Sequence, residues 1–467
     1  MEDKRVTAEE IMAEIDLDVR QMAKTVADAI NSAEAGAIID QSEEQVRDAH
    51  AVFRKATYQK ALSLLEKNQR AFSPRQSHPE VNWMNKGKQK TSYLTVNGRM
   101  EFTRTVFWNE GQGTVIPMDV LLGIESSNTS RGVCEICCRE SLNTAFVPAC
   151  DNIKRLAQLD ISSKTVRQLV EQEGRTLVHA QRQGQVGPDF TAKDCTHSTV
   201  ITGSDGVMVP TVTEDQKRKR RQTEAKKRTQ ENRKSTARAA RPRQGSDGDG
   251  YKEFKIVTFY DEDKSHQYVA GTSGNHEVAG RMMRQMGRQV EISQAQTKYS
   301  VSDGAVWILK QLNIQLPMLD DNVLDFYHLR EHVTIASHAL FGEGSEEAVS
   351  WKGKMMETAK TQGSLVMLDR LGDYMTGIPD DCGQTELQEL RDFIAKRISM
   401  TDYPSFLQRG YDIGSGPTES FCGCLTKRLK GAGMRWDKDN AESVMALAGL
   451  YSSHLWDKYW NRGSVAA

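Results

Sequence analysis

The sequence predicts an α/β protein in which a mixed β-sheet is accompanied by several helical regions. Short runs of apolar and β-branched residues, bounded by Gly and Asp, alternate with longer stretches in which apolar residues recur at helical spacing. Within residues 298–332, a strand-like run is followed by a helix-like run twice in succession. This repetition is typical of the strand–helix units that build α/β sheets.

Composition sets the broad class of the protein. The 467 residues suffice for two to four domains, and the formal net charge is −1 at pH 7. A mean hydropathy of −0.59 and the lack of a long apolar run in the sequence argue against a membrane partner or a membrane span. The acidic N-terminus does not resemble a signal peptide. We therefore expect a protein of the reducing cytoplasm.

Two regions are predicted at the start of the chain. Residues 1–75 carry apolar residues at helical spacing and predict a helical arm. Residues 76–128 contain TSYLTVNGRMEFTRTVFW, in which apolar and polar residues alternate on either side of Asn97-Gly98, the strongest short signal for a β-hairpin. Its basic side chains suggest a surface that faces nucleic acid, and an ordinary ribbon with a solvated face is the alternative.

Residues 129–195 return to helical spacing and predict a region that resembles a DNA-binding helix-turn-helix. Ser162 is the candidate N-cap of its second helix. Cys134, Cys137 and Cys138 invite a zinc hypothesis, but no second CxxC pair follows. Buried thiols are therefore the preferred interpretation.

The predicted core begins in residues 196–339. A run rich in β-branched residues around Asp205 predicts its first strand, and residues 254–260 and 266–271 predict the next two. A helix and the strand–helix pairs of 298–332 follow. Three strands, a helix and then strand–helix units form the order of a ribonuclease-H-like mixed sheet.

Two segments interrupt this core before it ends in residues 406–467. Residues 340–405 predict a helical insertion. Residues 214–249 form an arm dense in Lys and Arg without an apolar face, which suits a DNA phosphate backbone, and a solvated linker is the alternative. The candidate DNA-binding residues in the arm and in the last region are Lys217, Arg218, Lys219, Arg220, Arg221, Lys226, Lys227, Arg228, Lys427, Arg428 and Lys430.

Three acids are candidates for a catalytic metal site. Asp205 lies on the first core strand, Asp303 at the carboxyl end of a later strand, and Glu419 in the first turn of a late helix. Converging carboxylates of this kind hold divalent ions that activate a water or a 3′-hydroxyl, and Mg²⁺ (or Mn²⁺) prefers oxygen ligands. Taken singly, an Asp before Gly usually forms a turn and a first-turn Glu serves the helix dipole. Their order within one fold favours the metal site.

Five motifs carry a resemblance to a known family. VITGSDGVMVP, VSDGAVWI, LDFYHLREH, IGSGPTESFCG and LKGAGMRW, in this order, resemble the ISKra-type insertion-sequence transposases, which are bacterial DDE transposases related to the Mutator-like group. The resemblance covers roughly residues 115–460. It implies that Asp205, Asp303 and Glu419 are the DDE triad of a ribonuclease-H-like core.

The same resemblance assigns accessory residues and shows one departure. Asp325 and His328 match an Asp-x-x-His element that accompanies the second acid in such enzymes. Family members often carry a cysteine zinc ribbon before a segment that corresponds to Pro117-Met118-Asp119. This chain has a hairpin without cysteines there.

The resemblance implies a DNA transposase with a two-metal mechanism. We expect it to cleave DNA at the terminal inverted repeats of its element and to join the 3′-hydroxyl to target DNA. The expected setting is the bacterial nucleoid, and the expected assembly is a homodimer or a higher synaptic oligomer. Arg435 and Trp436 are candidates for stacking on an unpaired base, with core packing as the alternative for Trp436.

Two other functions stay open. A DNA-binding descendant would keep the fold without catalysis. A zinc metalloprotease is the less favoured alternative, because His328, Glu331 and His332 match the pattern H-x-x-E-H. The protease hypothesis leaves the acids and the basic arm unexplained.

Overall fold

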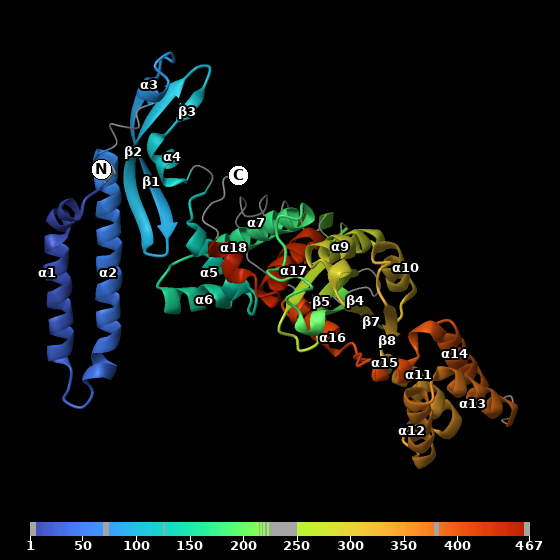
Figure 1. Cartoon of the computed structure of the whole chain (residues 1–467). Helices are drawn as coiled ribbons and strands as arrows, with labels where there is room; N and C mark the ends of the chain where they lie inside the picture. Colours follow the sequence, from blue (N-terminus) through green and yellow to red (C-terminus); the bar gives the residue numbers. More distant parts are fainter. Residues whose placement is uncertain are drawn as a thin grey trace. The chain divides into compact units, whose positions relative to one another are not determined.

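The computed structural model describes residues 6–68, 74–124, 127–213, 215–216, 218–219, 222–223, 250–377 and 383–461. The chain divides into two compact units, Met1–Val170 and Glu171–Ala467, and each is considered by itself. Figure 1 shows their elements along the chain. Within the described ranges, none of the helices combines the length and the apolar character needed to cross a membrane.

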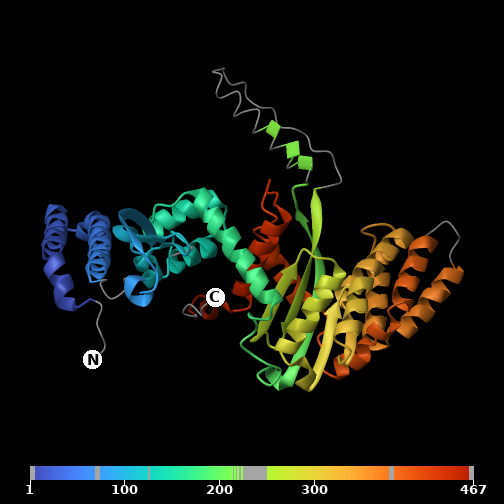
Figure 2. The ribbon, with the colours of Figure 1, turned by 90° about the horizontal axis from the view of Figure 1, so that it is seen from above.

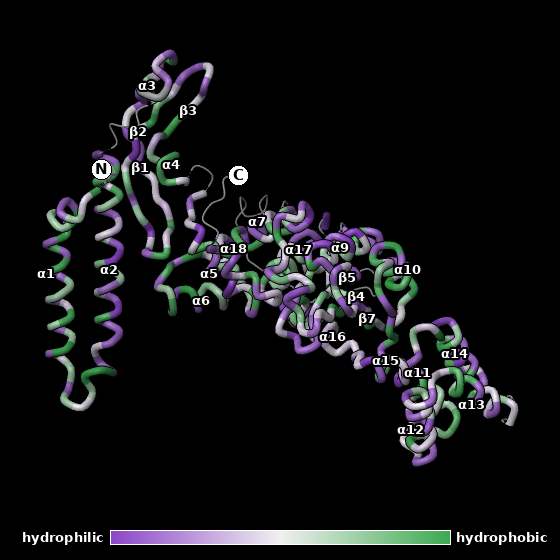
Figure 3. Tube along the Cα trace, in the orientation of Figure 1, coloured by the Kyte–Doolittle hydropathy of each residue, from purple (hydrophilic) through white to green (hydrophobic). Residues whose placement is uncertain are grey.

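The first unit pairs a helical hairpin with a small antiparallel sheet. Its elements are α1 (Ala8–Ser32), α2 (Ile38–Lys67), α3 (Pro74–Ser77), β1 (Met84–Thr95), β2 (Gly98–Asn109), β3 (Gly113–Val115), α4 (Pro117–Leu122), α5 (Arg131–Ser141), α6 (Phe146–Ala157) and the start of α7 (Ser163–Arg182). Figure 3 shows hydrophobic and hydrophilic residues alternating along α1 and α2, as expected for helices with one buried face.

Two local predictions in this unit are confirmed. The turn at Asn97-Gly98 joins β1 to β2, with Thr95 paired to Gly98. The Ser162 hydroxyl accepts a hydrogen bond from the Thr165 amide at 3.2 Å, as an N-cap should. A third strand, β3, was not predicted and pairs antiparallel with the end of β2.

The second unit contains the predicted mixed sheet, in the order β6-β5-β4-β7-β8. Its strands are β4 (Thr199–Pro210), β5 (Tyr251–Tyr260), β6 (Gln267–Thr272), β7 (Thr297–Ser302) and β8 (Asp321–Leu324). The pairs β4–β5 and β5–β6 are antiparallel, whereas β4–β7 and β7–β8 are parallel. The first strand in sequence is therefore the central strand, with the hairpin strands on one side and the strand–helix units on the other.

Helices cover both faces of this sheet. The remaining elements are η2 (Thr196–Ser198), α9 (His276–Gln289), η3 (Ile292–Gln294), α10 (Val306–Gln315), α11 (Phe326–Phe341), α12 (Glu346–Thr361), α13 (Ser364–Gly377), α14 (Gln384–Ala395), η4 (Ile398–Met400), α15 (Tyr403–Gln408), α16 (Gly416–Thr426), α17 (Lys438–Ser452) and α18 (Trp456–Asn461). Thr258 of β5 contacts Thr418 of α16, whereas its neighbour Phe259 reaches Gly287 of α9. Adjacent strand residues face opposite sides, so α9 and α16 lie on opposite faces. Figure 2 gives a second view of the ribbon.

The start of the helical insertion, after β8, lies beside the segment through which the chain returns to the sheet. α11 starts directly after β8, and the Phe326 amide donates to the Ile413 carbonyl at 2.9 Å. The Asp325 carboxylate caps α11 by accepting from the Tyr327 amide at 2.7 Å. On the returning segment, Tyr411 stacks on Tyr299 of β7, with ring centroids 4.0 Å apart. These contacts fix the segment that leads into α16.

Gly203 lets α16 pack directly on β4. A Cβ at this position would overlap Thr418 Oγ1 and would lie 2.9 Å from Thr258 Oγ1. The two threonine hydroxyl oxygens are themselves 3.1 Å apart and buried. A glycine at residue 203 therefore sets how closely the first turn of α16 approaches the central strand.

Gly203→Ala should destabilise the second unit, because the added methyl group occupies space that Thr418 already fills. Overpacking of this kind costs about 1–3 kcal/mol in the free energy of unfolding. Denaturant titration of the full chain measures the loss. Gly423→Ala on α16 is the matched control, since a Cβ there meets nothing within 4 Å, and it should be neutral or stabilising by about 0.5–1 kcal/mol. A neutral Gly203→Ala would contradict this close packing.

Candidate functional site

The sheet brings Asp205 and Asp303 to equivalent places on neighbouring strands. Gly203 of β4 pairs with Val301 of β7 in parallel register. Asp205 lies two residues further along β4, on the same face of the sheet as Gly203. Asp303 lies two residues beyond Val301, one residue past the end of β7. Neighbouring strands are about 4.8 Å apart. Asp303 follows the last residue of β7, at the carboxyl end where α/β sheets place their sites.

Helix α16 brings Glu419 to the same face. Thr418, its neighbour in the first turn, packs on Gly203. One turn later, the Cys422 thiol lies close enough to the Asp205 carboxylate to lower its pKa. Glu419 is exposed at this point of the helix, and its carboxylate accepts from the Ser415 hydroxyl at 3.1 Å. Helix packing therefore joins a distant acid to the pair on the sheet.

Electrostatics indicate that the three acids lie close together. Burial raises the pKa of Asp205, and the negative charges of Asp303 and Glu419 raise it further. The hydrogen bond from the Gly206 amide, at 2.6 Å, and the Cys422 thiol act in the opposite direction. A nearby like charge disfavours the ionised form of a carboxyl group. Asp303 and Glu419 therefore both lie within electrostatic range of Asp205.

The donor set suits a hard divalent cation, although the side chains do not yet converge on one point. Throughout the ranges given above, no group of three or more His, Cys, Asp and Glu side chains is arranged to hold a metal ion. The three carboxylates offer the oxygen ligands that Mg²⁺ and Mn²⁺ prefer, and a bound cation would offset the negative charge around Asp205. Mg²⁺ therefore fits the chemistry of these residues, and binding would require the side chains to turn toward a common centre.

Asp325 is connected to this site through Ser415. Its carboxylate is only 2% exposed and accepts from the Ser415 hydroxyl, in addition to capping α11. The same hydroxyl lies within hydrogen-bond distance of Glu419. Ser415 was not among the predicted site residues. It directly precedes the first residue of α16, and its side chain makes no capping hydrogen bond to that helix.

His328 and His332 form an aromatic stack on α11. The His332 ring lies flat on Phe393 of α14, with centroids 3.8 Å apart, and the His328 ring meets it edge-on at 5.3 Å. His328 Nδ1 lies 3.2 Å from the Glu331 carboxylate. Burial lowers the pKa of His332, and the charges of His328 and Arg397 lower it further. The two imidazoles that match H-x-x-E-H thus pack on a phenyl ring.

Arg397, which the sequence did not single out, lies beside Asp303. It follows α14 in the helical insertion, and its Nε donates to the Gly304 carbonyl at 3.0 Å. Its Nη1 donates to the Phe393 carbonyl at 3.1 Å, and the guanidinium carbon lies 4.0 Å from the centroid of the Phe393 ring. Burial lowers the pKa of Arg397, and the negative charge of Asp303 acts in the opposite direction. No local motif marks Arg397, because the contacts that bring it here are distant in sequence.

The Arg435–Trp436 pair is divided between surface and interior. Arg435 is exposed, whereas Trp436 is 8% exposed and donates from Nε1 to the Leu429 carbonyl at 3.2 Å. Arg428 is also buried, and its guanidinium carbon lies 5.0 Å from the centroid of the Trp436 ring system. This placement favours core packing for Trp436, and it leaves no open face of Arg428 for a DNA phosphate. Lys427 and Lys430 are exposed.

Two of the predicted DNA-binding residues of the basic arm are among the described residues. Arg218 and Lys219 are exposed, and Arg218 forms an ion pair with Asp215 at 3.1 Å. The other predicted DNA-binding residues of the arm lie outside the described residues: Lys217, Arg220, Arg221, Lys226, Lys227 and Arg228.

Several basic side chains of the N-terminal hairpin contact other residues of the first unit. Arg104 forms an ion pair with the buried Asp119 of α4, and Lys88 lies 3.6 Å from Glu66 of α2. The Lys86 ammonium lies over the Trp108 ring, 4.9 Å from its centroid. Arg104 is thus paired with a buried acid of the same unit, whereas Lys86 and Lys88 make these contacts and stay exposed.

Of the three cysteines predicted to be buried, Cys137 and Cys138 are fully buried on α5, whereas Cys134 is only partly buried. Burial raises the pKa of the Cys137 thiol to about 12, and nearby Cys134 and Cys150 contribute. Because the thiolate is the metal-binding form, this shift opposes zinc binding at neutral pH.

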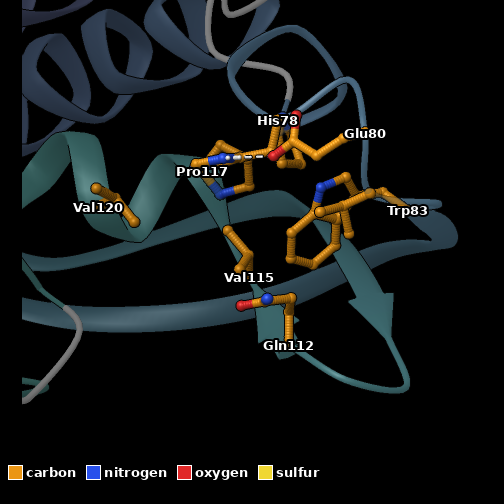
Figure 4. Close-up of a pocket in the computed structure, with 9 residues that line it drawn as sticks. His78, Glu80, Trp83, Gln112, Val115, Pro117 and Val120 are labelled. Carbon is orange, nitrogen blue, oxygen red and sulfur yellow. Dashed lines mark hydrogen bonds and ion pairs between the residues drawn. The ribbon is translucent and has the colours of Figure 1, made fainter.

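The first unit also contains a cavity of about 370 Å³ beside the hairpin (Figure 4). Val115, Pro117 and Val120 supply much of its apolar wall. Trp83 is 4% exposed, and its indole nitrogen has no hydrogen-bond partner among the described residues. None of the three acids lines this cavity.

No protein-family model matches the chain, and no curated protein gives a significant match to it. The geometry of the site and the motifs in the sequence therefore carry the functional conclusion.

Asp205→Asn should stabilise the protein at pH 7 in metal-free buffer. The folded state raises the pKa of Asp205, so its ionised form disfavours folding. The stability that the protonated acid contributes is present below about pH 4 and is lost as the pH rises through the ordinary value toward the raised one. The gain from Asn should therefore disappear at low pH, as measured by denaturant unfolding across a pH series.

Asp373→Asn is the control for this series, because Asp373 is exposed on α13 and its change should stay within about 0.5 kcal/mol. If Asp205→Asn lowered the free energy of unfolding at pH 7, the carboxylate would not be under the repulsion described here.

Proposed function

We propose that the chain is a DDE-type DNA transposase of a bacterial insertion sequence, which cleaves DNA strands and transfers the freed 3′-hydroxyl to target DNA. The observation that carries this proposal is that Asp303, just after β7, and Glu419, in the first turn of α16, lie within electrostatic range of Asp205 on β4, since the charges of Asp303 and Glu419 raise the pKa of Asp205. The strand order β6-β5-β4-β7-β8 supports a ribonuclease-H-like core beneath them.

The three carboxylates would hold one or two Mg²⁺ or Mn²⁺ ions. Such ions, when bound, activate a water or 3′-hydroxyl nucleophile and stabilise charge on the phosphate and the leaving oxygen. The chain itself fixes the ligands. Each aspartate lies two residues beyond the paired residues Gly203 and Val301, and the contact between Thr418 and Gly203 holds the helix of Glu419 against β4.

DNA would be bound through exposed basic side chains. Lys427 and Lys430 follow α16 on the same segment as Glu419, and the exposed Arg218 and Lys219 begin the basic arm. Lysine and arginine contacts to phosphates supply sequence-independent affinity that falls with salt. The proposed substrates are the terminal inverted repeats of the element and the target duplex. The proposed assembly is a homodimer or larger synaptic oligomer at the bacterial nucleoid.

Asp303→Asn should abolish cleavage while DNA binding persists. The substrate is a duplex taken from the DNA flanking the gene, incubated with the full chain and Mg²⁺, and gel analysis measures cleaved and joined strands. Loss of an outer-shell partner of a metal costs up to about 100-fold, so loss of a ligand should cost at least as much.

Asp373→Asn, the same exchange at an exposed position on α13, should leave cleavage unchanged. Equal cleavage by Asp303→Asn and the unaltered chain would remove Asp303 from the mechanism. Binding without cleavage by the unaltered chain would instead favour the DNA-binding descendant.

A further inference from the structure

Arg397 is a cation held in place beside a candidate catalytic acid. Two carbonyl oxygens, those of Gly304 and Phe393, accept from its Nε and Nη1 at 3.0 and 3.1 Å. The Phe393 ring supports the guanidinium group, and His332 stacks on that ring. A Cβ on Gly304 would lie 2.7 Å from Arg397 Nε, so the turn after Asp303 fits closely against this side chain.

The charge of Arg397 is not compensated by the residues that fix it. In the part of the chain that the structure describes, Arg397 makes no ion pair within 4.0 Å, and its Nη2 has no hydrogen-bond partner. Asp303 is close enough to influence it electrostatically but does not form a salt bridge with it. A half-buried, rigidly held guanidinium costs desolvation energy that two neutral carbonyls recover only in part.

An anionic ligand would complete this arrangement. A guanidinium has five N–H donors in a planar fork that matches the oxygens of a phosphate group. Only two of the donor nitrogens of Arg397 are engaged, by carbonyls of the protein itself. The remaining donors are available to a phosphate, on a guanidinium group that contacts Gly304, the residue next to Asp303.

We propose that Arg397 is a phosphate-binding residue, supplied by the helical insertion, that contacts the DNA backbone at the site of the three acids. This inference rests on the proposed function, because it takes DNA as the ligand. It gives the insertion a direct role in substrate binding: the segment between α14 and η4 supplies a cation next to Asp303, just past the carboxyl end of β7.

The test is the salt dependence of DNA affinity for the full chain without Mg²⁺, measured by fluorescence anisotropy with a short labelled duplex between about 50 and 200 mM salt. Arg397→Gln should reduce the magnitude of the slope of log affinity against log salt by about 0.9, the contribution of one phosphate contact. Arg397→Lys, which keeps the charge, should retain the slope. Other basic residues contribute equally to every variant, so the difference reports residue 397.

Arg391→Gln is the matched control, since Arg391 is exposed on α14 of the same insertion and loses the same charge. It should leave the slope unchanged. An unchanged slope for Arg397→Gln with a lowered melting midpoint would assign Arg397 a purely structural role and overturn the proposal, as would equal slope changes for Arg391→Gln and Arg397→Gln. If Arg397→Gln does not fold, Arg397→Met keeps the packing on Phe393 and decides the question in the same way.

This experiment is independent of catalysis, because no metal is present. A reduced slope in a chain that never cleaves DNA would sustain the phosphate contact and remove the transposase activity. Conversely, if the unaltered chain cleaves DNA but the salt slope of its DNA affinity does not depend on residue 397, the transposase activity would stand and the phosphate contact would be removed.

Discussion

The candidate site depends on the packing of α16 against the central strand, β4. Gly203 has no side chain, and Thr418 occupies the space that any other residue would fill. This contact carries Glu419 and Cys422 to the face of the sheet where Asp205 lies. The energy that holds the helix there comes from burial: α17, which packs against both α16 and β6, is buried along Ala441–Leu450.

Much of the fold could be predicted from local signals. The hairpin at Asn97-Gly98 and the cap at Ser162 follow from residue types with specific backbone chemistry. The strands of the mixed sheet follow from β-branched runs, and their order from the sequence of strand and helix. The strand Gly113–Val115 was missed because three residues carry no periodicity, and it exists only through pairing with β2. Likewise, only the tertiary structure shows that Trp436 is covered.

In the candidate site, too, some residues could be predicted from the sequence and others could not. The three acids could be identified because each lies in a recognisable motif and together they occur in one order. Ser415, Cys422 and Arg397 could not, because their significance comes from partners far away in the chain: Asp325, Asp205 and Gly304, respectively. A hydroxyl, a thiol or a guanidinium has no periodicity, and only the packing of the insertion and of α16 gives them their neighbours.

The Ser415 hydroxyl has a consequence for how the site can move. A hydroxyl carries a single hydrogen, yet Ser415 faces the carboxylates of both Asp325 and Glu419. It can donate to only one of them at a time. When the Glu419 side chain turns away from Ser415, that hydrogen remains with the buried Asp325, which keeps its partner. The exposed Glu419 side chain can therefore change its conformation without leaving an unsatisfied charge behind it in the protein interior.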